Sequence, residues 1–193
     1  MDFTTPKSPW SAVGQTFREI REYQELLKNN GKNKNTYNPN DDIMTPLHIA
    51  KRIIGQLPID VSDKILDPFR GTGAFYNQFP AGRHYWCEIK DGKDFFDFQE
   101  HVDWIISNPP YSKFTEVMQH SYEIADNIVY LIPLNKIVSS WGRCLDLDNY
   151  GGVKKIWIFP ACKANFPFGF PACVVWIQKG YKGTIETELW KDL

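Results

Sequence analysis

The sequence predicts an α/β fold, in which a mostly parallel sheet lies between layers of helices. Short apolar segments with strand character alternate along the chain with longer segments of helical periodicity, as in a doubly wound sheet. Several strand segments end in an acidic or amide residue that is followed closely by glycine or proline. Ligands of open α/β sheets bind at the carboxyl ends of the strands, so the functional residues are expected there.

The composition of the 193-residue chain is that of a globular domain, with 42% hydrophobic and 23% charged residues. The formal net charge of −1 provides no overall basic field, although a local groove can still be basic. No apolar run reaches transmembrane length and the first residues lack the pattern of a signal peptide, so no membrane contact is expected.

The cysteines show no C-x-x-C spacing, and two of them lie in predicted strands. They are interpreted as buried thiols in a reducing cytoplasm rather than as zinc ligands or disulfides, and no metal site is expected. The four are Cys87, Cys144, Cys162 and Cys173.

Two regions are expected, an N-terminal helix with a polar loop over residues 1–44 and a single α/β domain over residues 45–193. Apolar residues recur at helical spacing in residues 8–30. The Asn/Lys-rich run at residues 29–35 is interpreted as a solvated loop or as an arm that contacts phosphates.

The α/β domain begins with a helix and a strand. Thr45 and Pro46 predict a helix start, with threonine as the N-cap and proline at the first helical position, and the helix continues to about Leu57. Residues 64–67 (Lys-Ile-Leu-Asp) predict a short strand. After a glycine loop, a helix at residues 74–78 directs its amino end toward the site.

The glycine loop has the features of a nucleoside site. Gly71 and Gly73 let the backbone pass close to a ligand. A second strand at residues 84–87 leads to Glu88, about 20 residues after the acid of the first strand, as for an acid that binds ribose hydroxyls. Tyr76 stands where a third glycine would, which argues against a pyrophosphate and favours adenosine with a small charged group, as in S-adenosylmethionine.

A third strand, at residues 103–106, is followed by Ser-Asn-Pro-Pro-Tyr. Two prolines end the strand, because neither can donate to a ladder. The side-chain oxygen of Asn108 and the carbonyl of Pro109 are then two rigidly held acceptors, with the ring of Tyr111 beside them. This arrangement suits an exocyclic amino group on a planar ring.

The connection from Glu88 to the next segment, residues 94–98, is too short for a full helix and strand, so one βα unit looks curtailed. Residues 135–150 are interpreted as helix or loop. The remaining predictions are a helix at residues 114–125 and strands at residues 127–133, 153–159 and 172–178.

In the order of its motifs, the chain resembles the class I S-adenosylmethionine-dependent adenine-N6 DNA methyltransferases of the Asn-Pro-Pro-Tyr type. The resemblance covers roughly residues 43–182 and is to the small phage or mobile-element form without a separate target-recognition domain. It implies a Rossmann-like class I methyltransferase fold with a mostly parallel sheet of seven, or six, strands and an antiparallel last strand. S-adenosylmethionine is the implied cofactor, DNA is the implied partner, and residues 45–193 are the implied catalytic domain.

The resemblance also implies a role for each motif. The residues implied to bind the cofactor are Thr45, Pro46, Asp67, Pro68, Phe69, Gly71, Gly73, Glu88, Asp94 and Phe95. Of these, Asp94 and Phe95 meet its adenine. The implied catalytic residues are Asn108, Pro109, Pro110 and Tyr111. The residues implied to stack on the target base are Tyr111 and Phe166.

The chemistry explains the need for two acceptors. An adenine amino nitrogen is a poor nucleophile because its lone pair is delocalised into the ring. Accepting its two N–H bonds at Asn108 and Pro109 restores the lone pair, and no strong general base is required. A base inside a duplex is out of reach, so the target must be flipped out.

Several alternatives stay open. The same motif and fold serve adenine methylation in RNA, and an Asn-Pro-Pro-Tyr turn can grip the planar amide of a protein glutamine. A non-catalytic cofactor-binding subunit is the non-enzyme alternative. In the absence of a large recognition domain, specificity comes from loops, the N-terminal 44 residues, a homodimer or a partner subunit.

Overall fold

The computed structural model describes residues 43–164, 166 and 171–193. The described residues belong to one compact unit, Asn38–Leu193. The predicted helix at residues 8–30 and the Asn/Lys run at residues 29–35 lie outside the described residues. Among the helices described, none combines the length and apolar character needed to cross a membrane.

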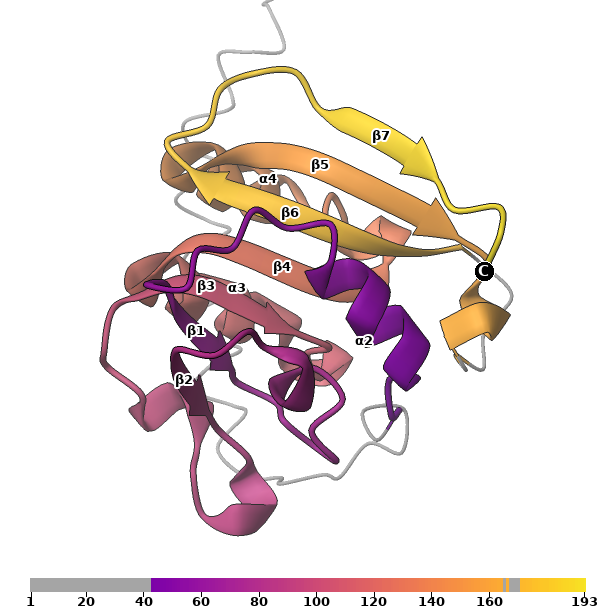
Figure 1. The fold of residues 1–193 in the computed structure, drawn as a ribbon. Helices are drawn as coiled ribbons and strands as arrows, with labels where there is room; N and C mark the ends of the chain where they lie inside the picture. Colours follow the sequence, from indigo (N-terminus) through magenta and orange to yellow (C-terminus); the bar gives the residue numbers. More distant parts are fainter. Residues whose placement is uncertain (1–42, 165, 167–170) are drawn as a thin grey trace, which may run out of the picture. The chain divides into compact units, whose positions relative to one another are not determined.

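A seven-stranded sheet forms the middle of the unit, in the order β2-β1-β3-β4-β6-β5-β7 (Figure 1). Strands β2, β1, β3 and β4 are parallel, β6 is antiparallel to both β4 and β5, and β7 is parallel to β5. The strands are β1 (Lys64–Asp67), β2 (Arg83–Trp86), β3 (Val102–Ser107), β4 (Ala125–Pro133), β5 (Gly151–Phe159), β6 (Ala172–Lys179) and β7 (Glu186–Leu189).

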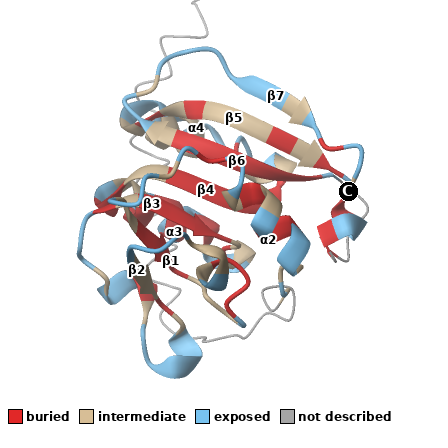
Figure 2. Ribbon diagram, in the orientation of Figure 1, coloured by how far each residue is buried: buried red, intermediate tan, exposed pale blue. Residues whose placement is uncertain are grey.

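Helices cover both faces of this sheet. Helix α2 (Leu47–Ile54) lies on one face, and α3 (Phe114–Ile124) and α4 (Trp141–Tyr150) lie on the other (Figure 1). Side chains alternate along β3, so Trp104 and Ile106 join the core under α2 whereas Ile105 joins the core under α3. The central strands are buried along most of their length (Figure 2). The α/β fold class and the mostly parallel seven-stranded sheet are confirmed.

The curtailed βα unit is also confirmed. Between β2 and β3 the chain forms only the 3₁₀ turns η4 (Ile89–Asp91) and η5 (Phe95–Asp97), and β2 stays at the edge of the sheet. The seventh strand is supplied at the opposite edge by β7, which the sequence did not predict because it is short and mostly exposed. The sequence predicted an antiparallel last strand. The antiparallel strand is β6, and the last strand described, β7, is parallel to β5.

Three local predictions were wrong. Helix α2 begins at Leu47 and ends at Ile54, and its N-cap position is Pro46, with no side-chain cap. The Thr45 hydroxyl instead accepts a hydrogen bond from the Asn108 side chain. The segment at residues 74–78 forms the 3₁₀ turn η3 (Tyr76–Gln78) rather than an α-helix, so this segment does not direct a helix dipole at the site.

Among the cysteines, Cys87 and Cys173 are buried as predicted, whereas Cys144 is half-buried and Cys162 is exposed. The segment at residues 135–150, for which the sequence allows helix or loop, contains the end of the 3₁₀ turn η7 (Leu134–Lys136) and then α4, which begins at Trp141 after the N-cap Ser140.

Candidate active site

The site lies where β1 and β3 end side by side. The chain moves outward from β1 to β2 on one side and from β3 to β4 on the other, so these carboxyl ends form the topological switch point of the sheet. Asp67 ends β1 and Ser107 ends β3, and the Ser107 hydroxyl donates a hydrogen bond of 2.6 Å to Oδ1 of Asp67. This bond joins the acid of the predicted cofactor loop to the residue that precedes the Asn-Pro-Pro-Tyr turn.

Asp67 is a fully buried acid. Burial raises the pKa of its carboxyl to about 7, while hydrogen bonds from Ser107 and from the backbone N–H groups of Phe69 and Tyr76 lower it in part. Those N–H groups lie 3.4 and 3.2 Å from the carboxylate oxygens. The acid thus fixes the loop after β1, and a nearby cation would favour its ionised form.

The raised pKa predicts a particular pH dependence of stability. A carboxyl that holds its proton more tightly in the folded state than in the unfolded state stabilises the fold most at low pH. Its contribution is lost as pH rises from about 4 to the folded-state pKa of about 7. Asparagine does not titrate, so only the unmodified protein loses this contribution. We expect the free energy of unfolding of Asp67→Asn minus that of the unmodified protein to rise over this window by a few kcal/mol and then to level off. Urea unfolding at several pH values measures it, and a pH-independent difference would contradict the raised pKa.

The glycine loop is held by Glu88 at the end of β2. One carboxylate oxygen of Glu88 accepts the Gly71 N–H at 2.8 Å and the other accepts the Lys90 N–H at 3.2 Å. Gly71 and Gly73 have φ values of 51° and 86°, which favour glycine. A Cβ on Gly73 would also lie 2.7 Å from the Asn77 amide nitrogen. Glu88 therefore holds the loop through Gly71, and the backbone conformation at both positions favours glycine.

Phe69 and Phe95 meet beside this loop, with ring centroids 5.2 Å apart in an edge-to-face contact. Phe95 is buried and also contacts the ring of His120 at 4.7 Å. The Asp94 carboxylate accepts the Phe96 N–H at 3.1 Å and so caps the turn that carries Phe95. Asp94 and Phe95 are the two residues predicted to meet the adenine of the cofactor. Phe95 packs against the loop residue Phe69, and Asp94 caps the turn that carries Phe95.

The Asn-Pro-Pro-Tyr turn, residues 108–111, is tied to the segment before α2. The Asn108 amide nitrogen donates to the Ile43 carbonyl at 3.1 Å and to the Thr45 hydroxyl at 3.3 Å. Because a carbonyl can only accept, these contacts fix the orientation of the amide and leave its oxygen directed to the other side. That oxygen accepts the Tyr111 hydroxyl at 3.0 Å.

The two predicted base-stacking residues also come together. The rings of Tyr111 and Phe166 meet edge to face, with centroids 6.1 Å apart and planes at 86°. Lys136, from the turn after β4, donates to the Tyr111 carbonyl at 3.3 Å, and its ammonium lies 5.9 Å from the Tyr111 ring centroid. Tyr111 therefore has an aromatic neighbour on one element and a cation on another.

Sequence reasoning missed three residues that organise this region. Ser107 had one usable signal, since it is a hydroxyl at the end of an apolar strand directly before the motif. Lys136 and Arg143 had none, because they lie in the segment of mixed helix and loop pattern. Their contacts with the Asn-Pro-Pro-Tyr turn and with α3 depend on β4 lying beside β3.

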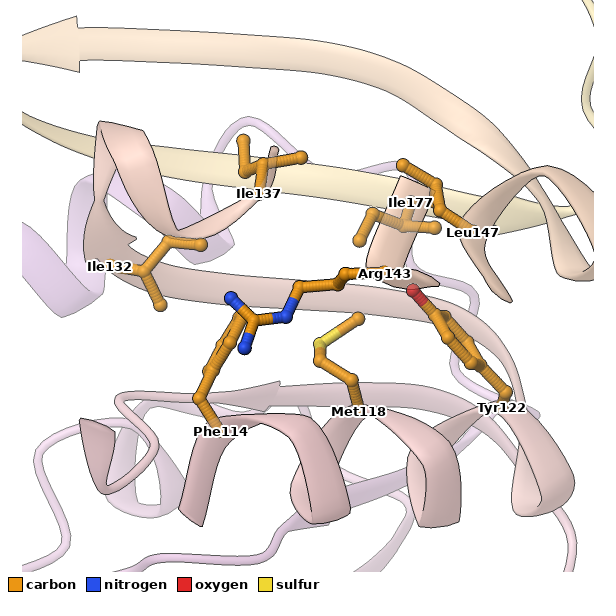
Figure 3. Close-up of a pocket in the computed structure, with 8 residues that line it drawn as sticks. All are labelled: Phe114, Met118, Tyr122, Ile132, Ile137, Arg143, Leu147 and Ile177. Carbon is orange, nitrogen blue, oxygen red and sulfur yellow. The ribbon is translucent and has the colours of Figure 1, made fainter. Parts of the chain in front are cut away.

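A small pocket lies between α3 and α4, over β4 and β6 (Figure 3). Its volume of about 10 Å³ is room for about one water molecule, so it is not a ligand site. The residues that line it are Phe114, Met118, Tyr122, Ile132, Ile137, Arg143, Leu147 and Ile177.

No protein-family model matches the sequence, and no curated protein matches it. Solved structures do share the fold. A protein from Listeria monocytogenes classed as a class I S-adenosylmethionine-dependent methyltransferase has a TM-score of 0.65 at 14% identity, over 91% of this chain and 73% of that chain. A type I restriction-modification methyltransferase subunit from Streptococcus thermophilus has a TM-score of 0.53 at 16% identity, over 73% and 46% of the two chains. A 23S rRNA methyltransferase has a TM-score of 0.54 at 11% identity, over 70% of each chain.

These comparisons show that the chain has the Rossmann-like fold of class I methyltransferases. The chain spans less than half of the length of the restriction-modification subunit.

Proposed function

We propose that this protein transfers a methyl group from S-adenosylmethionine to the exocyclic N6 amino group of adenine in DNA. The observation that carries the proposal is the Asn108 side chain at the end of β3. Its amide is oriented by Ile43 and Thr45, its oxygen lies beside an aromatic pair, and the adjacent strand end carries Asp67. An acceptor beside aromatic rings suits an amino group on a planar base.

The residues at the ends of β1 and β2 fit S-adenosylmethionine as the methyl donor. Asp67 is a buried acid whose raised pKa would fall beside the positively charged groups of that cofactor. Glu88 follows the neighbouring strand β2, and its two carboxylate oxygens accept the N–H groups of Gly71 and Lys90. Each oxygen has a further lone pair that a ribose hydroxyl could use. When bound, the cofactor supplies a methyl group already activated by its sulfonium.

On the acceptor side, this chain's residues bind and orient the base. The Asn108 oxygen and the Pro109 carbonyl accept the two N–H bonds of the amino group, which makes the nitrogen lone pair available along the direction of attack. As the N–C bond forms, the bond from the methyl carbon to the donor sulfur would break and leave a neutral thioether; the nitrogen becomes acidic and its proton leaves to solvent, so no strong base is needed. Alignment of the two groups then supplies most of the rate.

The proposed complex includes one rearrangement. The Tyr111 hydroxyl donates to the Asn108 oxygen and takes one of its two lone pairs, so it competes with a target amino group and moves away in the proposed complex. A bond of this kind contributes about 0.5–1.5 kcal/mol net, which the incoming N–H bond replaces. The ring of Tyr111 is then available to stack on the flipped base, together with Phe166.

The experiment that tests the proposal compares substrate classes directly. The purified protein is incubated with S-adenosylmethionine carrying a deuterated methyl group and, separately, with DNA, RNA and protein pools, and the products are digested and identified by mass spectrometry. Labelled N6-methyladenine in DNA alone is the expected result. Label in RNA adenine or in protein glutamine would replace DNA as the substrate, and no label in any pool would favour a cofactor-binding subunit.

A prediction for the cofactor side concerns Glu88. We expect Glu88→Ala to bind S-adenosylmethionine more weakly by about 1.5–3 kcal/mol, since a ribose hydroxyl loses a charged acceptor. Glu88→Gln keeps one oxygen for the Gly71 N–H and should lose less. Isothermal calorimetry measures both, with Glu186→Ala as the control, since Glu186 is exposed on β7, at the side of the sheet away from β2. An affinity unchanged in Glu88→Ala would remove this residue from the site.

A further inference from the structure

The turn after β4 presents apolar side chains to solvent beside the catalytic turn. Val138 is 67% exposed and Trp141, the first residue of α4, is 66% exposed. Strands β3 and β4 are parallel neighbours, so the turns that follow them leave from the same edge of the sheet. Apolar side chains that are exposed together beside a functional site are candidates for a contact surface.

This turn is held firmly in place by Arg143. From α4, its guanidinium donates to the Lys136 carbonyl at 2.8 Å, to the Ser139 hydroxyl, and to the Thr115 hydroxyl on α3 at 2.6 Å. It also lies over the Phe114 ring, 5.2 Å from the centroid (Figure 3). The segment that carries Val138 and Trp141 is therefore joined to α3 by hydrogen bonds.

The surroundings of the exposed pair are basic. Lys113 is exposed directly after the catalytic turn, and Lys136 lies against Tyr111. Within the described ranges, neither lysine forms an ion pair with a carboxylate, and neither does Arg143. An aromatic side chain among unpaired cations matches a nucleic acid strand, which has stacking faces and phosphates together.

We infer that Val138 and Trp141 contact the bases of DNA next to the flipped adenine, with Trp141 as the stacking residue. The inference rests on the proposed function and adds the element that grips the strand around the target. A flipped base leaves a gap in the stack, and a rigid apolar wedge at the mouth of the site would fill it and offset part of the unstacking cost.

Fluorescence anisotropy of labelled DNA, single-stranded and duplex, with S-adenosylhomocysteine present, tests this inference. We expect Trp141→Ala to weaken binding roughly 5- to 150-fold, as for the loss of one stacked base. Trp141→Phe should recover most of the affinity, and Val138→Ser should cost less than Trp141→Ala. The matched control is Ile185→Ala, because Ile185 is 54% exposed and directly precedes β7. Strand β7 runs in the same direction as β4, so Ile185 lies at the end of the sheet opposite to the turn after β4.

The salt dependence separates stacking from charge. Trp141→Ala should lower the affinity at every salt concentration without changing the slope of log affinity against log salt. Lys113→Ala should instead reduce that slope by about 1.

Each of the following results would overturn the inference. Equal DNA binding by Trp141→Ala and the unmodified protein would exclude the contact. A dimer that becomes monomeric in Trp141→Ala, with DNA affinity unchanged, would assign the surface to self-association. If the unmodified protein methylates DNA and Trp141→Ala has the same KM and kcat, only this inference fails. If the unmodified protein neither methylates nor binds DNA, the proposed function fails as well.

Discussion

Asn108→Ala is expected to lower kcat for methyl transfer by about 10²–10³ while leaving cofactor affinity nearly unchanged. The Asn108 oxygen accepts a bond that strengthens as the target nitrogen rehybridises, so it stabilises the transition state more than the bound substrate. Among the residues that the structure describes, its hydrogen-bond partners are Ile43, Thr45 and Tyr111, and of these only Thr45 is implied in cofactor binding.

Three measurements make this test specific. Single-turnover rates report the chemical step, and calorimetry with S-adenosylhomocysteine reports the cofactor site. Asn108→Asp keeps the accepting oxygens but replaces the donor that faces the Ile43 carbonyl, so we expect it to be impaired as well. Asn149→Ala, at an exposed position on α4, is the matched control. Turnover of Asn108→Ala close to that of the control would make the turn structural and favour a cofactor-binding subunit.

Tyr111→Ala is expected to raise KM for DNA and to lower kcat, because a stacking face worth about 1–3 kcal/mol per base is removed. Tyr111→Phe keeps that face and deletes only the hydroxyl that occupies the Asn108 oxygen. Its activity should therefore equal that of the unmodified protein or exceed it, by up to about tenfold, as the competing bond contributes about 0.5–1.5 kcal/mol.

The comparison of KM and kcat across this pair distinguishes two roles of the tyrosine. Recovery in Tyr111→Phe assigns the ring to base binding and the hydroxyl to the resting state of the site. A loss in Tyr111→Phe as large as in Tyr111→Ala would instead make the hydroxyl part of the chemistry. Phe166→Ala, which removes the edge-to-face neighbour of Tyr111, should resemble Tyr111→Ala in direction.

Where the sequence had strong local patterns, the predictions were accurate. The strands at residues 64–67 and 172–178 have apolar runs bounded by polar residues, and the structure places strands there within about a residue. The short path from Glu88 to Asp94 excluded a full βα unit on chain length alone, and the structure forms only 3₁₀ turns there. The sequence predicted that the Thr45 hydroxyl caps helix α2, because threonine before Pro46 is typical of an N-cap. The structure shows no such cap, and the hydroxyl instead accepts a hydrogen bond from the distant Asn108.

The sequence by itself determined the fold class, the strand ends at which polar groups gather, and the amide turn, because these depend on periodicity and on proline geometry within a few residues. Only the tertiary structure decided which of those groups meet. The bond from Ser107 to Asp67, the hold of Glu88 on Gly71, and the tie from Arg143 to Thr115 each join residues far apart in the chain. Their positions follow from strand order and register, and no pattern within a single segment specifies these.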